Sequence, residues 1–287
     1  MKRINGYLQL SFDSEYKQLV ASDIITPLYR HRVCFYLNPL KLFFKEENNC
    51  YPELIGSEIA KWLNIDSVYY DMLEFISLDK SFKGVISEDF RKNNYKLVTM
   101  DKIIDGYLLD SNNKALYNDM NLELLSKAIS NHYSNYKHKE KIVSKIMDDI
   151  KKSFLFDILI GNIDNGRYNY EIMENDTDGQ LTPYFDYEHI FKFGTTRLTV
   201  NDSNNYDVYD NLLIFLNSEV NYVDYFKKMY DLLTPDKIEE LFIKIENDKG
   251  IKIPDNYKNI VFLSYSRHYQ NLGNVLDKVI GSVHTKK

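Results

Sequence analysis

An acid, an amide and a second acid follow one another near the middle of this chain, in an order that suits phosphate chemistry. Asp164 and Asn169 lie in the loop-like run 160–169, and Asp186 follows after a short strand and a turn. A loop Asp can accept the proton of a substrate hydroxyl, and an Asn carbonyl oxygen can ligate a hard cation. The second Asp can bridge Mg²⁺ and phosphate oxygens, because Mg²⁺ takes oxygen ligands with few protein donors. The order therefore predicts a site for Mg²⁺ and for a reacting hydroxyl.

Length, charge and composition limit the class of protein. The 287 residues can bury one or two cores, so a two-lobed protein is expected. A net charge of −6 gives no electrostatic footprint for non-specific nucleic-acid binding. No apolar run reaches membrane-spanning length, and the first residues lack the apolar segment of a signal peptide. These features predict a cytoplasmic protein that binds neither nucleic acid nor membrane.

The two cysteines, Cys34 and Cys50, lie in no metal-ligand spacing. Neither a disulfide framework nor a zinc site is therefore predicted.

The first hundred residues pattern as strands with one helix. In residues 7–12 the apolar positions alternate as in a half-buried strand, and Pro52 fits the first turn of a helix over 53–63. Further strands are predicted at residues 32–37, 40–45, 68–73 and 83–86, and the apolar run 95–100 fits a crossover.

Beyond about residue 100 the pattern becomes helical. Apolar residues recur every four positions through 138–160, which predicts one long helix that ends at the acidic loop. A hairpin is expected around the turn-rich residues 175–179, and further helices are expected over 122–133, 222–233, 235–247 and 254–279. The predicted fold class is α+β, with a β-rich lobe over 1–99, a mainly helical lobe over 100–287 and a binding cleft between them.

Three sequence blocks follow one another over roughly residues 40–190. The first is Leu-Phe-Phe-Lys ending at Lys45, followed by an acidic helix. The second is Asp-Ile-Leu-Ile-Gly-Asn-Ile-Asp ending at Asp164, with Asn169 after it. The third is Thr-Pro-Tyr-Phe-Asp ending at Asp186. In their type and order these blocks resemble the HipA-like serine/threonine kinases, a branch of the protein-kinase superfamily, in which the third block is the metal-binding segment. The resemblance implies a two-lobed, protein kinase-like fold.

The resemblance also implies a role for each matching residue. Asp164 is the implied catalytic base or hydroxyl-positioning acid, and Asn169 and Asp186 are the implied Mg²⁺ ligands. Lys45 is expected to contact the α- and β-phosphates of ATP. Glu53 is its expected ion-pair partner, with Glu58 as the alternative.

The segment around Lys96 and Val98 is expected at the hinge, where the backbone hydrogen-bonds adenine. Asp157, one turn before the loop, is expected to brace the loop by hydrogen bonds.

Two departures from the family pattern affect the site. Family loops commonly carry a histidine where this chain has Gly166. No glycine-rich phosphate loop precedes Lys45, and the candidate region 27–32 contains no glycine, although Arg30 or Arg32 can supply positive charge there.

Each candidate residue also has an ordinary structural interpretation. Asp164 and Asn169 fit a simple turn, and Asp186 fits a surface acid after a strand. Lys45 fits a solvated lysine at a strand end, and a glutamate near a helix start such as Glu53 favours the helix dipole. The order of the blocks favours the functional interpretation for the loop residues and leaves that of Glu53 and Glu58 open.

The sequence thus predicts an ATP- and Mg²⁺-dependent kinase that phosphorylates a Ser or Thr hydroxyl of a protein. Two alternatives stay open: a nucleotide- or partner-binding pseudokinase, and a phosphotransferase acting on a small molecule. The resemblance further implies autophosphorylation, a toxin or effector role, and a cognate antitoxin or regulator as partner.

Overall fold

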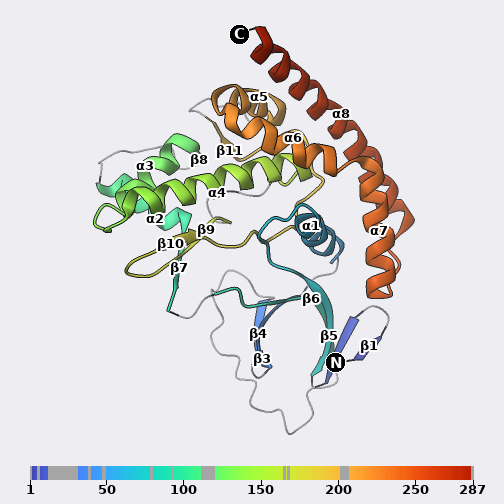
Figure 1. The fold of residues 1–287 in the computed structure, drawn as a ribbon. Coiled ribbons are helices and arrows are strands. Elements are labelled where there is room, and N and C mark those ends of the chain that lie inside the picture. The colour runs from blue at the N-terminus through green and yellow to red at the C-terminus, as the bar shows by residue number, and fades with distance from the viewer. Residues whose placement is uncertain are drawn as a thin grey trace. The chain divides into compact units, whose positions relative to one another are not determined.

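The computed structural model describes most of the chain and divides it into two compact units (Figure 1). Unit 1 comprises Met1–Phe90, Pro183–Glu188 and Asp236–Asn259, and unit 2 comprises Arg91–Thr182, His189–Pro235 and Ile260–Lys287. Both units are therefore discontinuous in the sequence. The described residues are 2–4, 7–11, 32–37, 40–46, 50–77, 80–91, 94–110, 120–163, 166, 169–200 and 207–285.

Unit 1 is built on a six-stranded sheet in the order β1-β2-β5-β6-β4-β3. All neighbouring pairs are antiparallel except β2 and β5, which run parallel. Strand β4 lies between β6 and β3, so both edges of its backbone are paired, and Lys45 stands opposite Val85 of β6. The strands are β1 (Lys2–Ile4), β2 (Tyr7–Ser11), β3 (Arg32–Leu37), β4 (Leu40–Glu46), β5 (Asp71–Ser77) and β6 (Lys80–Glu88).

Helix α1 (Tyr51–Trp62) follows β4 and starts with Pro52, whose missing amide hydrogen is tolerated in the first turn. Every residue from Pro52 to Ala60 is buried, so the helix is surrounded on all sides. Unit 1 also contains helix α7 (Pro235–Lys249), apart from its first residue, and the first turn of α8 (Asp255–Thr285).

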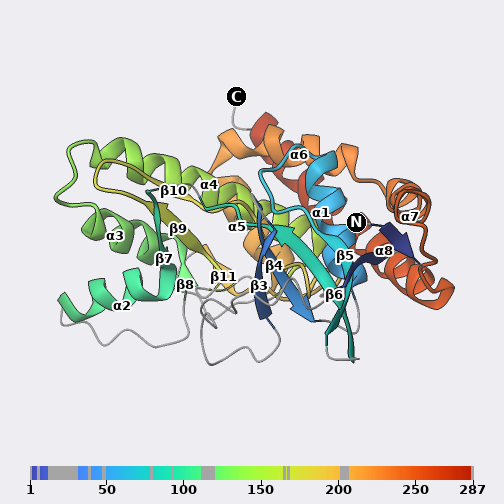
Figure 2. The ribbon, with the colours of Figure 1, turned by 90° about the horizontal axis from the view of Figure 1, so that it is seen from below.

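Unit 2 begins with strand β7 (Lys96–Thr99), the edge strand of a three-stranded antiparallel sheet in the order β10-β9-β7. Its partners β9 (Glu171–Glu174) and β10 (Gly179–Leu181) form the predicted hairpin beyond the acidic loop, beside α4 (Figure 2). A two-residue parallel pair joins β8 (Met120–Asn121) to β11 (Leu198–Thr199).

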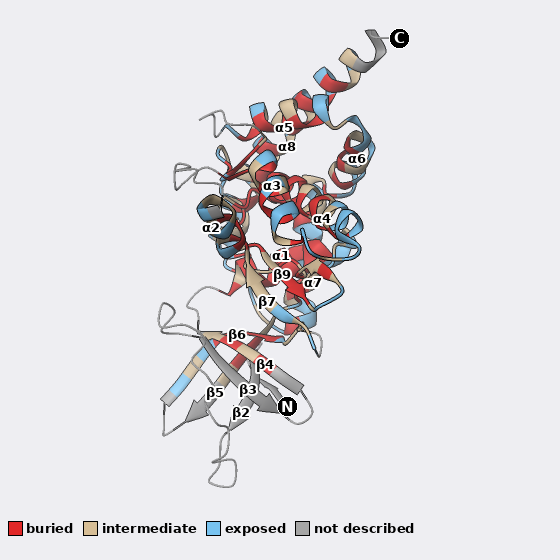
Figure 3. Cartoon of the chain, turned by 90° about the vertical axis from the view of Figure 1, so that its left-hand side faces the viewer, coloured by how far each residue is buried: buried red, intermediate tan, exposed pale blue. Residues whose placement is uncertain are grey.

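The helices of unit 2 carry many buried apolar residues (Figure 3). They are α2 (Met100–Asp110), α3 (Leu122–His132), α4 (Lys139–Ile160), α5 (Val208–Ser218), α6 (Val223–Leu232) and the rest of α8, with a 3₁₀ turn at Val220–Tyr222. None of the helices within the described ranges is both long and apolar enough to cross a membrane.

Most predicted elements are present, with shifted ends. The long helix predicted over 138–160 is α4, and the strand predicted over 68–73 begins later, as β5. The crossover at 95–100 is strand β7 followed directly by α2, a helix that the apolar pattern did not indicate. Helix α5 was also not predicted. Of the candidate phosphate loop at 27–32, residues 27–31 lie outside the described residues, and Arg32 is the first residue of β3.

Candidate active site

Lys45 lies at the centre of a cluster of three carboxylates in unit 1. Its Nζ is 2.9 Å from Glu53 Oε1, 3.2 Å from Asp186 Oδ1 and 2.9 Å from Glu188 Oε2. An ammonium group has three donors, and each carboxylate here takes one of these contacts. The four residues of the cluster come from β4, α1 and the segment Pro183–Glu188, which supplies two of them, and all lie within unit 1. The structure thus brings Lys45 and Glu53 together with Asp186, which lies 141 residues after Lys45 in the sequence.

Glu53 is the most buried member of the cluster. Its side chain is 1% exposed, and burial raises its pKa, an effect opposed by the charge of Lys45 and reinforced by that of Asp186. Both carboxylate oxygens are occupied, because Oε2 accepts the backbone N–H of Tyr187 at 2.9 Å. Glu53 therefore ties helix α1 to the lysine and to the residue that follows Asp186.

Asp186 occupies a left-handed backbone conformation, with φ of 67°. Asp and Asn tolerate this region better than most side chains do. Its backbone N–H donates to the hydroxyl of Tyr70 at 3.4 Å, and the ring of Tyr70 meets that of Tyr187 edge-on.

Gly56 allows α1 to approach this segment closely. A Cβ atom at Gly56 would lie 2.3 Å from the ring of Tyr187, well inside van der Waals contact. Glycine is therefore required in this turn of α1, one turn after Glu53, and the fit between α1 and the Asp186 segment is tight.

The acidic loop in unit 2 starts at a well-formed helix end. Gly161 caps α4 with φ of 64° and ψ of 44°. The N–H of Asn162 donates to Asp157 O at 2.9 Å and that of Gly161 to Ile158 O at 3.3 Å, which is the Schellman pattern. This cap ends the helix and turns the chain into the loop.

Buried side chains brace the loop behind this cap. The carboxylate of Asp157 is buried and accepts a hydrogen bond from the hydroxyl of Tyr170 at 3.3 Å. Burial and the neighbouring Asp157 together raise the pKa of Tyr170, so this hydroxyl keeps its proton and acts as the donor. This hydrogen bond is of the kind that the sequence predicted for Asp157, in which the side chain supports the loop.

Beyond residue 163, Gly166 and Asn169 are the loop residues that the structure describes. The N–H of Asn169 donates to Gly166 O at 2.9 Å, closing a turn, and its side chain is partly buried. Asp164, the predicted catalytic acid, lies outside the described residues.

Replacement of Gly161 by alanine is expected to destabilise unit 2 by more than the ordinary cost of a left-handed residue. That ordinary cost is about 1–2 kcal/mol. A Cβ atom at Gly161 would also lie 2.3 Å from the Phe193 ring, whereas one at Gly250, at the same φ of 64°, would meet nothing within 4 Å. Urea unfolding of Gly161→Ala and Gly250→Ala measures the difference. Equal losses of stability would contradict the argument.

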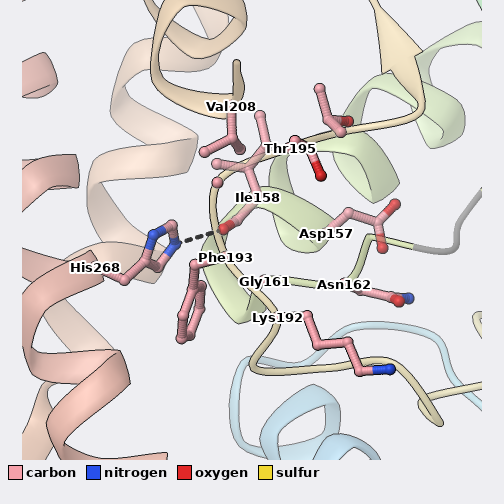
Figure 4. A pocket seen from close by; sticks show the side chains of 11 residues that line it. Asp157, Ile158, Gly161, Asn162, Lys192, Phe193, Thr195, Val208 and His268 are labelled. Atoms are coloured by element: carbon pink, nitrogen blue, oxygen red, sulfur yellow. Dashed lines mark hydrogen bonds between the residues drawn. The ribbon is translucent and has the colours of Figure 1, made fainter. Parts of the chain in front are cut away.

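A second buried contact fixes the last turn of α4 from the other side. His268 of α8 is 1% exposed, and its Nε2 lies 2.7 Å from Ile158 O (Figure 4). A carbonyl only accepts, so Nε2 carries the hydrogen and Nδ1 accepts from the Tyr209 hydroxyl at 2.9 Å. In Figure 4 the side chains of Asp157 and Asn162 lie on the opposite side from His268.

Stability is expected to depend on pH through His268. Burial lowers its pKa from 6.5 to about 4, so between these values the unfolded chain binds a proton that the folded chain does not. The stabilisation is complete above pH 6.5 and is lost as the pH falls toward 4, by about 3 kcal/mol in total. Urea unfolding of wild type and His268→Gln at pH 7.5 and 4.5 tests this. A pH dependence that is the same in both proteins would rule out His268 as the source.

The predicted hinge residues lie in β7. Lys96 stands opposite Glu174 in the antiparallel pair, and Val98 stands opposite Ile172. Among the described strands β7 is paired on one edge only, so its other edge is free of a strand partner. The backbone N–H of Met100, directly after β7, donates to Tyr170 O at 2.9 Å, which connects this strand to the end of the acidic loop.

The Lys96 side chain has a protein partner. It contacts Glu174 Oε1 at 3.1 Å, while Glu174 Oε2 accepts from the Tyr133 hydroxyl at 2.8 Å and lies 2.7 Å from His132 Nε2. Burial opposes the charge of Glu174, but these three partners outweigh it and hold its pKa at about 2. The side chain of Lys96 therefore secures the β7–β9 pair.

Sequence reasoning missed three members of this arrangement. Glu188 and Tyr70 contact the predicted site directly, and Glu174 organises the strand that carries the hinge. The motif Asp-Tyr-Glu at 186–188 offered a signal for Glu188, because it places a second acid two residues after the predicted metal ligand. No sequence pattern marked Tyr70 or Glu174.

No protein-family profile and no curated protein sequence matches this chain. Solved structures do match its fold. It is similar to the proinflammatory kinase CtkA of Helicobacter pylori, with a TM-score of 0.65 and 17% identity over 88% of this chain and 95% of CtkA. It is also similar to HipA of Shewanella oneidensis MR-1, a toxin–antitoxin protein solved with HipB and operator DNA. That match has a TM-score of 0.57 and 14% identity over 84% of this chain and 60% of HipA.

These likenesses identify the fold. The chain has the two-lobed, kinase-like fold of the HipA-like kinases, which confirms the α+β class expected from the sequence. The roles of individual residues rest on the geometry described above.

Proposed function

We propose that this chain, which has the fold of the HipA-like kinases, is an ATP- and Mg²⁺-dependent kinase that transfers the γ-phosphate to a Ser or Thr hydroxyl of a protein. The observation that carries the proposal is the cluster in unit 1, in which Lys45 contacts a buried glutamate from the following helix and Asp186. Active protein kinases require a strand lysine paired with a helix glutamate and a metal-binding Asp. An ordinary surface lysine has no such partners.

Lys45 is proposed to hold the α- and β-phosphates. Glu53 orients the ammonium group, because it is itself fixed by the backbone N–H of Tyr187. Three carboxylates surround this one ammonium group, so the cluster carries a net negative charge and attracts a cation. Such a site suits a nucleotide that arrives together with a divalent metal ion.

The oxygen-bearing side chains predicted for the site fit the coordination that Mg²⁺ prefers. Among the residues that the structure describes, no three His, Cys, Asp or Glu side chains form a metal site by themselves. Mg²⁺ keeps several waters and typically takes one or two carboxylates together with substrate phosphates. Asp186 is therefore proposed as its carboxylate ligand, and the Asn169 amide oxygen is proposed as a further ligand. When bound, the ion neutralises charge on the transferring phosphoryl group.

The remaining roles fall to unit 2. Asp164 is proposed to orient the substrate hydroxyl and accept its proton, from a loop whose start is fixed by the Gly161 cap and by Asp157. The edge of β7 near Val98 is proposed to hydrogen-bond the adenine, while the side chain of Lys96 remains with Glu174.

Replacement of Glu188 by glutamine is expected to lower the KM for ATP. A phosphate oxygen can reach Lys45 only by displacing one carboxylate, and Glu188 is the most exposed of the three at 49%. Exposed ion pairs contribute about 0.2–1 kcal/mol, which corresponds to a change of up to roughly fivefold in KM. Steady-state kinetics measures the change. A higher KM would instead assign Glu188 to metal binding.

A nucleotide-binding module without turnover is the second candidate. Gly166 favours it, because this chain lacks the histidine that family loops commonly carry at that position. Thermal shift with ATP and Mg²⁺, run beside an assay for ADP formation, separates the candidates. The kinase proposal requires both a stabilising shift and ADP formation, whereas a shift without ADP supports the module.

The class of acceptor is part of the proposal. A Ser or Thr hydroxyl of a protein is favoured over a small molecule, and peptide and metabolite mixtures incubated with ATP and analysed by mass spectrometry distinguish them. An antitoxin-like regulator is proposed as a partner by analogy with HipA, which was solved together with HipB.

A further inference from the structure

Helix α1 carries two buried glutamates on different faces. Glu53 is fully buried and Glu58 is 4% exposed. Five residues along a helix correspond to a rotation of about 140° between side chains, so the two carboxylates point away from each other. Glu53 contacts Lys45, which leaves Glu58 with a separate set of partners. A buried carboxylate is stabilised only where it is paired and hydrogen-bonded.

The partners of Glu58 include a residue almost two hundred positions away. Glu58 Oε1 accepts from the Tyr69 hydroxyl at 2.9 Å, and Oε2 forms an ion pair with Lys244 of α7. Burial opposes the charge of Lys244, but Glu58 and the nearby Asp248 outweigh it and raise its pKa. Lys244 therefore stays charged at neutral pH, and its ion pair joins α7 to the helix that carries Glu53.

The segment Asp236–Asn259, called here the clamp segment, contacts α1 near both ends as well. The Nζ of Lys237 lies 3.9 Å from the centre of the Trp62 ring, at the last residue of α1. At the first residue of α1, the ring of Tyr51 lies 5.7 Å from that of Tyr257. With Lys244 at Glu58 between them, the contacts reach the first residue, the middle and the last residue of α1.

The clamp segment is also tied to the sheet beside α1. Lys249, which is 7% exposed, lies 3.2 Å from Asp71 of β5 and 4.9 Å from the centre of the Tyr69 ring. The turn after α7 is closed by Glu246, whose Oε1 accepts the backbone N–H of Ile253 at 2.8 Å and lies 3.1 Å from Lys258 Nζ. The segment is thus a folded support with several buried contacts.

We propose that the clamp segment positions α1, and that the Glu58–Lys244 pair acts through the helix to hold Glu53 against Lys45. Glu58 and Lys244 are then positioning residues for the reaction. The role in catalysis rests on the proposed kinase function, whereas the mechanical coupling from Lys244 to Lys45 does not. Kinases in general depend on the placement of the helix that carries this glutamate. Here that placement would be set by a segment from the C-terminal part of the same chain.

Chemical labelling of Lys45 tests the coupling without ATP. Acetic anhydride acylates the free Nζ atom of a lysine, and Glu53 Oε1 holds the Nζ of Lys45 in a hydrogen bond of 2.9 Å. Loss of the Glu53 contact is therefore expected to raise labelling of Lys45 by about tenfold. We expect this rise in Lys244→Ala, wild-type labelling in Lys244→Arg, and no further rise when Lys244→Ala is added to Glu53→Gln. Peptide mass spectrometry after brief labelling gives the rate for each lysine.

Lys252→Ala is the matched control, because Lys252 lies in the same segment, is 77% exposed and pairs only with Asp255 among the described contacts. Urea unfolding shows whether each variant is folded. Where Lys244→Ala fails to fold, Lys237→Ala, which removes the contact with Trp62, decides the question through a smaller rise in Lys45 labelling.

Unchanged Lys45 labelling in a folded Lys244→Ala, or an equal rise in Lys252→Ala, would overturn the proposal. A phosphoryl-transfer assay on the same proteins separates the two proposals. If Lys45 labelling rises in Lys244→Ala but the wild-type chain transfers no phosphate, the positioning role of the clamp segment stands and the proposed kinase function fails.

Discussion

Asp186→Asn is expected to reduce phosphoryl transfer by about two to three orders of magnitude while the chain stays folded. The substitution removes the charge that would face Mg²⁺ and the phosphates, and such electrostatic contacts to a developing charge are worth about 10²–10³ in rate. Asparagine has the shape of the native side chain and tolerates the left-handed backbone at φ of 67°. The loss should therefore appear in kcat rather than in stability. Measurement of kcat and of the urea midpoint for both proteins provides the test.

Asp231→Asn is the matched control for this experiment. Asp231 lies in α6, is 52% exposed in an i,i+4 pair with Lys227, and takes no part in the site. It should retain full transfer. Transfer by Asp186→Asn at the rate of Asp231→Asn would remove Asp186 from the mechanism.

Lys45→Met is expected to abolish transfer and also to destabilise the chain, by about 3–5 kcal/mol at neutral pH. The substitution leaves Glu53 buried without its cation, and removal of one partner from a buried pair typically has an effect of this size. The second variant, Lys45→Met/Glu53→Gln, removes the stranded charge as well. We expect it to regain most of the lost stability and none of the transfer activity, as measured by urea unfolding and by ADP formation.

The destabilisation in Lys45→Met should also depend on pH. Burial already raises the pKa of Glu53, and removal of the lysine raises it further. An acid with a raised folded-state pKa loses stability as the pH rises from its unfolded value toward its folded value. The single variant should therefore lose less stability at pH 5 than at pH 8. A loss that is equal at both pH values would show that packing, and not the unpaired charge, is responsible.

Local patterns in the sequence predicted the elements that hold the site. The four-residue apolar repeat located α4, and Gly161 after it marked the helix end from which the acidic loop begins. The order of Lys45, Glu53 and Asp186 predicted a cluster that the structure brings together. These features depend on short-range chemistry, which a single sequence records directly.

Other features depend on tertiary contacts that no local pattern encodes. Glu58 was an alternative partner for Lys45, but it faces away from the lysine and contacts Lys244. The apolar pattern of α7 resembles that of any amphipathic helix. It therefore does not predict that the segment Asp236–Asn259 packs in unit 1. The predicted role of Asp164 stays a prediction, because this residue lies outside the described part of the chain.

The central claim is that this chain transfers the γ-phosphate of ATP with the Lys45–Glu53–Asp186 cluster. The most direct measurement is the intact mass of the chain after incubation with ATP and Mg²⁺, with Asp186→Asn treated in parallel. We predict that wild type gains the mass of one or more phosphoryl groups and that the variant gains none. An unmodified wild type, or equal modification of both proteins, would contradict the claim.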